Sequence, residues 1–371
     1  MSTLKVINSI HPSGSTNNLV FDNAGNTTAG GTLAMSSSFL RNRIINGNMR
    51  IDQRNNGTSG TSNSTYTVDR WYYYGSQANK VTWSQSAAVG PPVGFQKYFS
   101  FTSSSAYAVA ASDEFDFYQS IEGFNVEDLA WGSANAKTVT LSFWVRSSLT
   151  GTFGGVLTNY NNSRSYPYSY VITSANTWEQ KSITIPGDTS GYWLVGNGIG
   201  ISVSFSLGAG STVSGPAGSW SGSYYVGVTG ATSVVATNGA TFYITGVQLE
   251  VGSVATPFER RLYPQELALC QRYFNTVKAI SGTSGNSSNT VYANVQYSEM
   301  RATPTYAVTG ALNFTDPGTA SYFQSSGNVA TASGGNPNGA FLSFGNLSGM
   351  TANKVIMTNS SSTYLTLSAE L

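Results

Sequence analysis

Short stretches of alternating residues recur along this 371-residue chain, and turn-forming residues separate them. In TVTLSFWVRS (138–147), the apolar residues Val139, Leu141, Phe143 and Val145 share one face of an extended chain. A period of two is typical of a half-buried β-strand. The pattern returns in QKSITIP (180–186), GIGISVSFSL (198–207) and ATFYITGVQLEV (240–251). It predicts an all-β fold, with an antiparallel jelly-roll sandwich between about residues 41 and 260.

Composition limits the classes of partner. Only 9% of the residues are charged and the net charge is +1, so neither nucleic acid nor an anionic membrane is an expected partner. No stretch has the roughly 20 apolar residues that a membrane helix needs, and the N-terminus lacks a signal-peptide core. The single cysteine, Cys270, permits no intrachain disulfide, which indicates assembly in a reducing cytoplasm. The uncharged, Tyr-, Ser-, Thr- and Asn-rich composition suits use outside a cell, as in a virus particle.

The flanking segments complete the predicted domain organisation. Residues 1–40 form a polar leader in which LVFDNAGNTT (19–28) predicts one hairpin. Residues 276–371 return to short strands and predict a second, small β domain. Residues 261–275 are the one helical stretch and are interpreted as a joint between the two β domains.

The joint helix has an apolar face. Pro264 suits a first helical turn, and Leu267, Cys270 and Phe274 follow at i, i+3 and i+7. About ten residues are marginal as an isolated helix, so its stability must come from docking. Cys270 is interpreted as a small buried hydrophobe rather than as a nucleophile or ligand.

Several segments resemble tail-fibre and appendage proteins of bacteriophages that infect marine bacteria and cyanobacteria. The N-terminal MSTLKV and HPSGSTNNLVFDNAGN resemble the leader of such fibres, and RNRIINGNMRIDQRNNG followed by YTVDRWYY resembles the start of their jelly-roll module. The most specific match is FYITGVQLEVGSVATPFERRLYPQELALCQRYF (242–274). The module is also similar to carbohydrate-binding jelly rolls of bacterial glycanases.

The resemblance implies a virion protein that is a homotrimer. Its leader would attach to another tail or virion protein, and its β domains would contact a glycan of the host surface. Trimerisation would also stabilise the leader and the short helix, which are marginal in one copy.

The residue types in the sequence give little support to an enzymatic function. The only histidine, His11, lies in the leader, so the Ser/His/Asp and Cys/His sets are excluded and no catalytic residue is assigned. Six acids crowd into ASDEFDFYQSIEGFNVEDLA (111–130), and two of them, Asp116 and Glu122, would be the first candidates in a polysaccharide depolymerase. The alternative is that these acids cap a short helix or face water.

Two further sites follow from the resemblance and from residue type. Related jelly rolls hold a structural calcium ion, and Asp52 and Glu250 are the nearest equivalents here, although Asn48 stands where an acid is expected. No other cofactor is expected. Exposed aromatic rings in Gly/Ser-rich loops are candidate sugar platforms, namely Tyr166, Tyr168, Trp193 and Tyr224, and they could equally pack or line a subunit interface. WYYYG (71–75) alternates, so half of its rings are expected in the core.

The resulting hypothesis is a non-enzymatic phage tail fibre or appendage that adheres to host glycans. The first alternative is a purely structural collar, baseplate or head component, and the second is a polysaccharide depolymerase.

Overall fold

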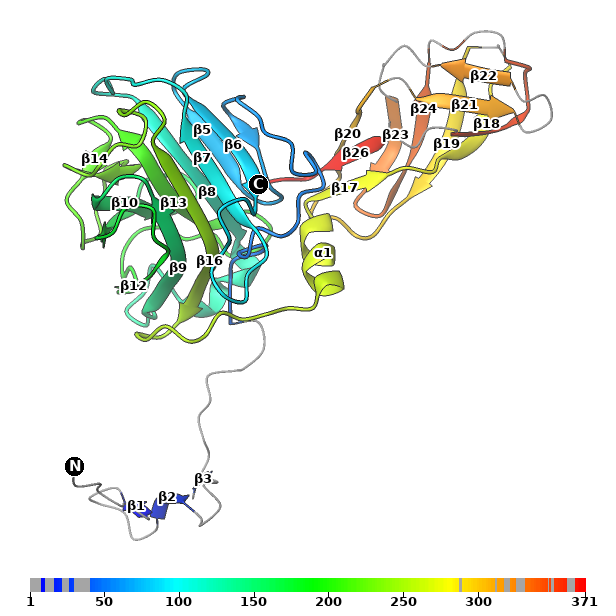
Figure 1. Ribbon diagram of the computed structural model, residues 1–371. Helices are drawn as coiled ribbons and strands as arrows, with labels where there is room; N and C mark the ends of the chain where they lie inside the picture. The colour runs from blue at the N-terminus through cyan, green and yellow to red at the C-terminus, as the bar shows by residue number, and fades with distance from the viewer. Residues whose placement is uncertain are drawn as a thin grey trace. The chain divides into compact units, whose positions relative to one another are not determined.

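The structure of the chain is a computed structural model. It describes residues 8–10, 17–21, 27–29, 41–286, 289–310, 312–316, 321–324, 331–345, 347, 350–358 and 364–371. The chain divides into two compact units, Met1–Arg41 and Asn42–Leu371. The first contains an antiparallel sheet of β1 (Asn8–Ile10), β2 (Asn17–Phe21) and β3 (Thr27–Ala29) (Figure 1). The pairing of β2 with β3 confirms the predicted hairpin, whose turn lies outside the described residues.

The second unit begins with a sandwich of two antiparallel sheets, which confirms the predicted all-β jelly-roll class (Figure 1). One sheet has the order β11-β10-β13-β8-β5-β4, and the other has the order β12-β9-β16-β7-β6. The six-stranded sheet contains β4 (Thr65–Tyr66), β5 (Tyr72–Gly75), β8 (Glu114–Glu122), β10 (Gly151–Thr158), β11 (Ser165–Ile172) and β13 (Ile199–Ala209). The five-stranded sheet contains β6 (Val81–Ser86), β7 (Tyr98–Ser103), β9 (Val139–Ser147), β12 (Glu179–Ile185) and β16 (Thr241–Val251).

Shorter elements join these strands. Two 3-10 turns, η1 (Gly123–Asn125) and η2 (Glu127–Leu129), follow β8, so a short helical stretch does occur near VEDLAW. A parallel pair, β14 (Ser214–Gly215) and β15 (Gly227–Val228), lies between β13 and β16. Strand β16 contains a bulge at Gly246, whose φ of +64° glycine adopts without strain, and the register with β9 shifts there.

The core between the sheets follows the period-two pattern. Val139, Leu141, Phe143 and Val145 of β9 are all buried, as predicted. Aromatic rings fill the centre, where Phe117 and Phe205 stack with ring centroids 5.2 Å apart. The prediction for WYYYG is also confirmed, because Trp71 and Tyr73 are buried whereas Tyr72 and Tyr74 are only half-buried.

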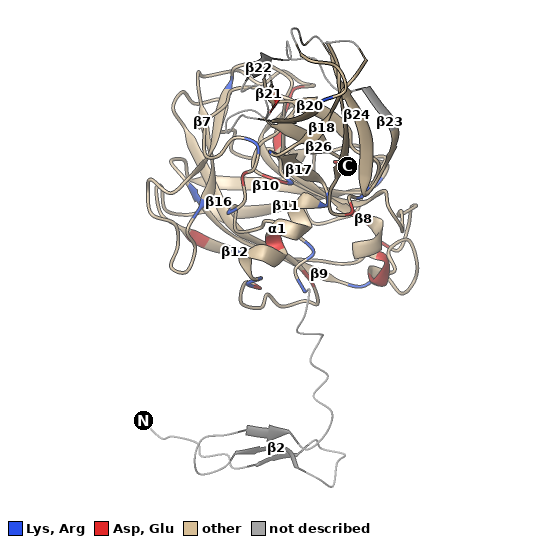
Figure 2. Cartoon of the chain, turned by 90° about the vertical axis from the view of Figure 1, so that its right-hand side faces the viewer, with Lys and Arg blue, Asp and Glu red and all other residues tan. Residues whose placement is uncertain are grey.

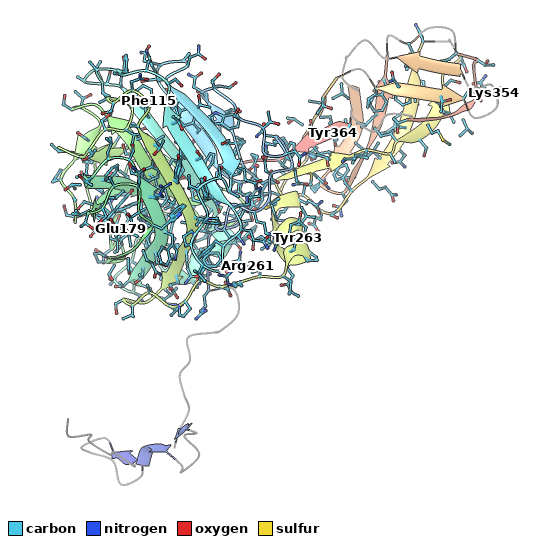
Figure 3. The ribbon with its side chains drawn as sticks, in the orientation of Figure 1. Phe115, Glu179, Arg261, Tyr263, Lys354 and Tyr364 are labelled. Atoms are coloured by element: carbon cyan, nitrogen blue, oxygen red, sulfur yellow. The ribbon has the colours of Figure 1, made fainter. Side chains whose placement is uncertain are left out.

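Within the described ranges there is one α-helix, α1, which runs from Tyr263, labelled in Figure 3, to Gln271. Pro264 occupies its first turn, as predicted. Cys270 is fully buried with Ile45, Ile51 and Tyr273, and Leu267 packs against this cluster. The helix therefore docks within its own chain, although Leu267 stays half-buried. Burial also raises the pKa of the Cys270 thiol, in agreement with the interpretation as a buried hydrophobe.

Phe274 corrects the predicted extent of the helix. It begins strand β17 (Phe274–Val277), where it pairs with Ser368 of β26 (Leu365–Ser368). The helix ends because backbone groups after Gln271 bond to a strand about 90 residues further along the chain. Phe274 is buried beneath the Arg54 guanidinium, 3.8 Å from its ring centre, rather than on a helix face.

The C-terminal region has its own core and two sheets. One sheet has the order β17-β26-β20, and the other has the order β22-β21-β25-β18-β19-β24-β23. The remaining bounds are β18 (Ser281–Ser284), β19 (Val291–Gln296), β20 (Thr305–Val308), β21 (Asn313–Asp316), β22 (Ser321–Gln324), β23 (Thr331–Asn336), β24 (Gly339–Phe344) and β25 (Val355–Thr358). The predicted domain boundaries at 260 and 275 stay predictions.

Charged residues are sparse on the chain, as Figure 2 shows, and several are used in buried contacts. Glu370, just after β26, accepts hydrogen bonds from Arg54, at 2.8 Å, and from Arg70. Arg70 also donates to the Ser120 carbonyl and lies over the Tyr273 ring. These contacts tie the end of β26 to the sandwich. Among the described residues, no helix is both long and apolar enough to span a bilayer.

Candidate functional site

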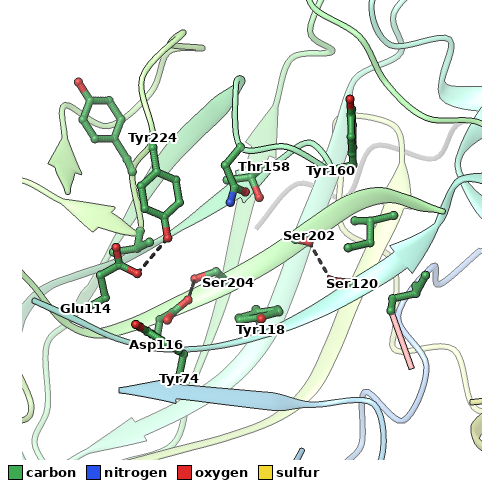
Figure 4. A pocket seen from close by; sticks show the side chains of 15 residues that line it. Tyr74, Glu114, Asp116, Tyr118, Ser120, Thr158, Tyr160, Ser202, Ser204 and Tyr224 are labelled. Carbon is green, nitrogen blue, oxygen red and sulfur yellow. Dashed lines mark hydrogen bonds between the residues drawn. The ribbon is translucent and has the colours of Figure 1, made fainter. Parts of the chain in front are cut away.

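A cleft of about 350 Å³ lies on the outer face of the six-stranded sheet of the sandwich (Figure 4). Its lining is polar and aromatic, with five tyrosines, two acidic side chains, four serine or threonine hydroxyls and one amide side chain. The lining residues are Tyr74, Glu114, Asp116, Tyr118, Ser120, Thr158, Tyr160, Asn162, Ile199, Ser202, Ser204, Tyr224, Tyr225, Val226 and Leu371. Among the described residues, none that lines the cleft is Lys, Arg or His.

Period-two alternation in β8 and β13 builds the floor of this cleft. In EFDFYQS, Phe115 and Phe117 are fully buried in the core, so Glu114, Asp116 and Tyr118 take the outer face. ISVSFSL in β13 places Ser202 and Ser204 beside them, because Ser204 pairs with Tyr118 across the two strands. The outer face of this sheet is thus polar by sequence pattern.

The two carboxylates of the cleft are held by hydroxyl groups (Figure 4). The Ser204 hydroxyl donates to Asp116 at 2.8 Å, and the Tyr224 hydroxyl donates to Glu114 at 2.9 Å. Burial raises the pKa of Asp116 to about 7 and also raises the pKa of Glu114. Asp116 therefore changes its protonation state near neutral pH. Its protonated form can both donate and accept hydrogen bonds.

Tyrosine rings form the sides of the cleft. Tyr74 and Tyr118 come from the neighbouring strands β5 and β8, and Tyr160 stands on the turn between β10 and β11 with 42% of its surface exposed. The hydroxyls of these three tyrosines make no hydrogen bond within the part of the chain that the structure describes. They are available to a ligand that offers both donors and acceptors.

Of the four predicted sugar platforms, only Tyr224 lines the cleft. Tyr166 and Tyr168 do not lie in an exposed loop, because β11 alternates and turns both rings into the core. The Tyr168 hydroxyl donates a hydrogen bond to the Ser204 carbonyl at 2.7 Å. Trp193 is 8% exposed and packs edge-to-face against Trp131 and Trp220. The expected exposure of these three residues is therefore wrong.

The acids of residues 111–130 are not brought together as one catalytic group. Asp116 and Glu114 line the cleft, but Glu122 is absent from its lining and pairs with Arg272 at 3.1 Å. Asp113 accepts hydrogen bonds from Tyr107 and Ser76. Asp128 pairs with Arg43 at 2.9 Å, and Glu127 is exposed.

Asp52 and Glu250, the predicted calcium ligands, both accept hydrogen bonds from nearby groups of the chain. Asp52 accepts hydrogen bonds from the amides of Asn55 and Gly57. Glu250 accepts from Gln248 and from the amide and hydroxyl of Thr256. In the described ranges, no group of three or more His, Cys, Asp or Glu residues could hold a metal ion. The calcium site stays a prediction that these contacts do not favour.

Asn48, which replaces the expected acid, has a buried side-chain oxygen without a hydrogen-bond partner in the described structure. The small pocket next to it is lined by Arg50 and Arg260. Their positive charges oppose a bound cation. The orphaned oxygen therefore gives no support to calcium.

Of the residues that line the cleft, the sequence predicts only Tyr224 as a sugar contact. The signal that could have found them is the polar half of the alternation in 114–120 and 202–206, read together as one sheet face. Tyr160 and Tyr225 have no such signal, because they reach the cleft from turns and loops.

Comparisons with known proteins assign no family. No family model matches the chain, and no curated protein matches it. Solved structures that are similar include the enzymatically active domain of bacteriophage CBA120 tailspike protein 4, at 13% identity and a TM-score of 0.32. That match covers 57% of this chain and 22% of the tailspike chain, so this chain corresponds to about a fifth of that protein.

Two carbohydrate-binding modules are also similar. TmCBM61 in complex with β-1,4-galactotriose has 12% identity and a TM-score of 0.29, and the match covers 57% of this chain and 99% of that one. The family 11 module from Clostridium thermocellum, in complex with a mixed-linked tetrasaccharide, has 12% identity and a TM-score of 0.28, with 53% and 98% covered. These values are too low to assign a family or a function.

Proposed function

We propose that this chain binds neutral glycans in the tyrosine-lined cleft of its sandwich. The observation that carries the proposal is the lining itself, in which exposed or half-exposed tyrosine rings alternate with hydroxyl, amide and carboxyl groups. Sugar rings stack their C–H faces on aromatic rings, and their hydroxyls need partners that both donate and accept. The cleft supplies both in one concave surface.

The charge of the cleft narrows the ligand class. Glu114 contributes negative charge, Asp116 adds to that charge above about pH 7, and none of the described lining residues is cationic. An acidic polysaccharide would therefore meet like charge, which selects against it. Neutral polysaccharides are the expected ligands.

The biological setting proposed is that of a phage appendage, which rests on the sequence resemblance. In this setting the protein is a homotrimer, made in the host cytoplasm, whose leader docks on another virion protein and whose cleft adheres to host envelope glycans. Weak single sites would gain strength from several copies on one particle. A structural collar, baseplate or head component would instead show no glycan binding.

Affinity electrophoresis tests the proposal. The chain should be retarded by at least one neutral polysaccharide among mixed-linkage β-glucan, galactan and galactomannan, and not by alginate or polygalacturonate. Tyr118→Ala should weaken that retardation about tenfold, because it removes a stacking platform. Tyr243→Ala is the matched control, since this half-buried tyrosine lies on the five-stranded sheet. Equal loss in both variants, or binding that Tyr118→Ala leaves intact, would contradict the assignment.

The carboxyl pair favours one second candidate, a polysaccharide depolymerase. Glu114 and Asp116 are two residues apart on one strand face, which places their Cα atoms roughly 7 Å apart, within reach of the carboxyl spacings used by glycosidases. A carboxyl group whose pKa is raised to about 7 suits a proton donor. Release of reducing ends from a bound polysaccharide, abolished by Asp116→Asn, would favour cleavage over binding.

A further inference from the structure

A second concave surface lies in the C-terminal region, on the outer face of the seven-stranded sheet. It is a groove of about 570 Å³ that crosses β19, β24 and the turn that joins β23 to β24. The lining residues are Asn294, Gln296, Tyr297, Gly334, Asn336, Asn338, Gly339, Ala340 and Phe341. The groove shares no residue with the cleft of the sandwich.

The register of three strands explains why the surface is hollow. Gln296 of β19 pairs with Gly339 of β24, and Gly339 pairs with Asn336 of β23. Paired residues of neighbouring strands share a face, so a glycine stands between two amide-bearing residues. Because glycine has no side chain, a gap opens between them.

Aromatic rings border this gap in the adjoining rows. Phe341 pairs with Asn294, and the Phe341 ring stacks on Tyr292 with centroids 5.8 Å apart and planes 6° from parallel. Phe341 is 48% exposed and Tyr292 is 40% exposed. Two parallel aromatic rings thus stand in solvent beside a row of amides, where nothing in the fold requires them.

The side chains of the groove select a type of ligand. None of the described residues that line the groove is Asp, Glu, Lys, Arg or His. Asn294 and Gln296 are exposed, and their amides make no hydrogen bond to any residue that the structure describes. An amide both donates and accepts, which matches the hydroxyl groups of a sugar. We infer that this groove is a second binding site for a neutral glycan, with Phe341 as the stacking platform.

The groove fits a glycan better than it fits a second copy of the chain. The centre of a protein–protein interface is packed with large apolar and aromatic side chains. Here a glycine stands between two exposed amide side chains, and the rings stand at the border. With both sites on one chain, a long polysaccharide could engage two regions at once, which raises the effective concentration at the second site.

Affinity electrophoresis of the full chain also tests this inference, with mixed-linkage β-glucan, galactan, galactomannan and dextran as probes. The Tyr118→Ala chain should still bind at least one probe. Adding Phe341→Ala or Asn294→Ala to it should weaken that residual binding about tenfold. Met357→Ala is the matched control, because Met357 is 42% exposed on the same face of the sheet but outside the groove.

Three results would overturn the inference. In the first, the Tyr118→Ala chain binds no probe, and in the second, its residual binding survives both groove substitutions. In the third, Phe341→Ala lowers the sedimentation coefficient of a folded chain, which identifies the face as a contact between copies. If the groove substitutions alone abolished binding, the proposal for the cleft would be refuted and the proposal for the groove would stand. The two proposals therefore fail separately.

Discussion

At the scale of single residues, the Arg70 guanidinium is a buried positive charge in the sandwich that needs a compensating negative charge. Arg70 is 1% exposed, adopts a φ of +74°, and depends on Glu370 for a compensating charge. Glu370→Gln should lower the free energy of unfolding by about 3–5 kcal/mol, because it leaves a buried cation without its partner. Urea denaturation measures the change. Glu127→Gln, at an exposed position, should stay within about 0.5 kcal/mol, and equal midpoints for both variants would contradict the role of the pair.

Asp116 links the cleft to a pH dependence of stability. Its pKa is raised from 3.8 to about 7 by burial, so between these values the folded state holds a proton that the unfolded state has lost. The free energy of unfolding therefore falls as pH rises from about 4 to 7. Asp116→Asn should remove this slope. Its free energy of unfolding should therefore rise relative to that of wild type by roughly 2–4 kcal/mol as the pH increases from 5 to 8. Parallel pH profiles of the two proteins, measured by urea denaturation, would refute the assignment.

The cleft residues also show what sequence can identify. Alternation in 114–120 is enough to assign Glu114, Asp116 and Tyr118 to the face opposite Phe115 and Phe117, where the structure places them, but the predictions from the sequence do not use it. The same rule, applied to SYPYSY, would have placed Tyr166 and Tyr168 together on a core face. Composition alone suggested loops there, because Ser and Pro resemble turn residues, but a paired strand overrides that local preference.

At the scale of elements, strands within one period-two stretch could be predicted, whereas boundaries set by distant partners could not. The bounds of β9 and β16 follow closely from 138–147 and 240–251. The end of α1 does not, because Phe274 is drawn into β17 by pairing with β26 near the end of the chain. Nor could the order of strands in either sandwich sheet be predicted, since register depends on contacts that are remote in sequence.

At the scale of the whole molecule, the homotrimer stays a prediction, and the helix no longer supplies its reason. The apolar side of α1 is covered by Ile45 and Ile51 of the same chain, and the sandwich and the C-terminal region each have a core of their own. We therefore expect contacts between copies to involve other surfaces. Any trimer is expected to persist when the packing of the helix is weakened.

Leu267→Ala tests this separation of folding from assembly. Leu267 packs against the buried cluster of Ile45, Ile51, Cys270 and Tyr273. The substitution should therefore lower the free energy of unfolding by about 1–3 kcal/mol. Analytical ultracentrifugation should give the same oligomeric state as wild type, and Leu262→Ala, at a position 70% exposed, should change neither quantity. A folded Leu267→Ala chain that sediments as a monomer beside a trimeric wild type would return the helix to the subunit interface. A monomeric wild type would remove the trimer itself, while both glycan sites, each built from a single chain, would remain open to test.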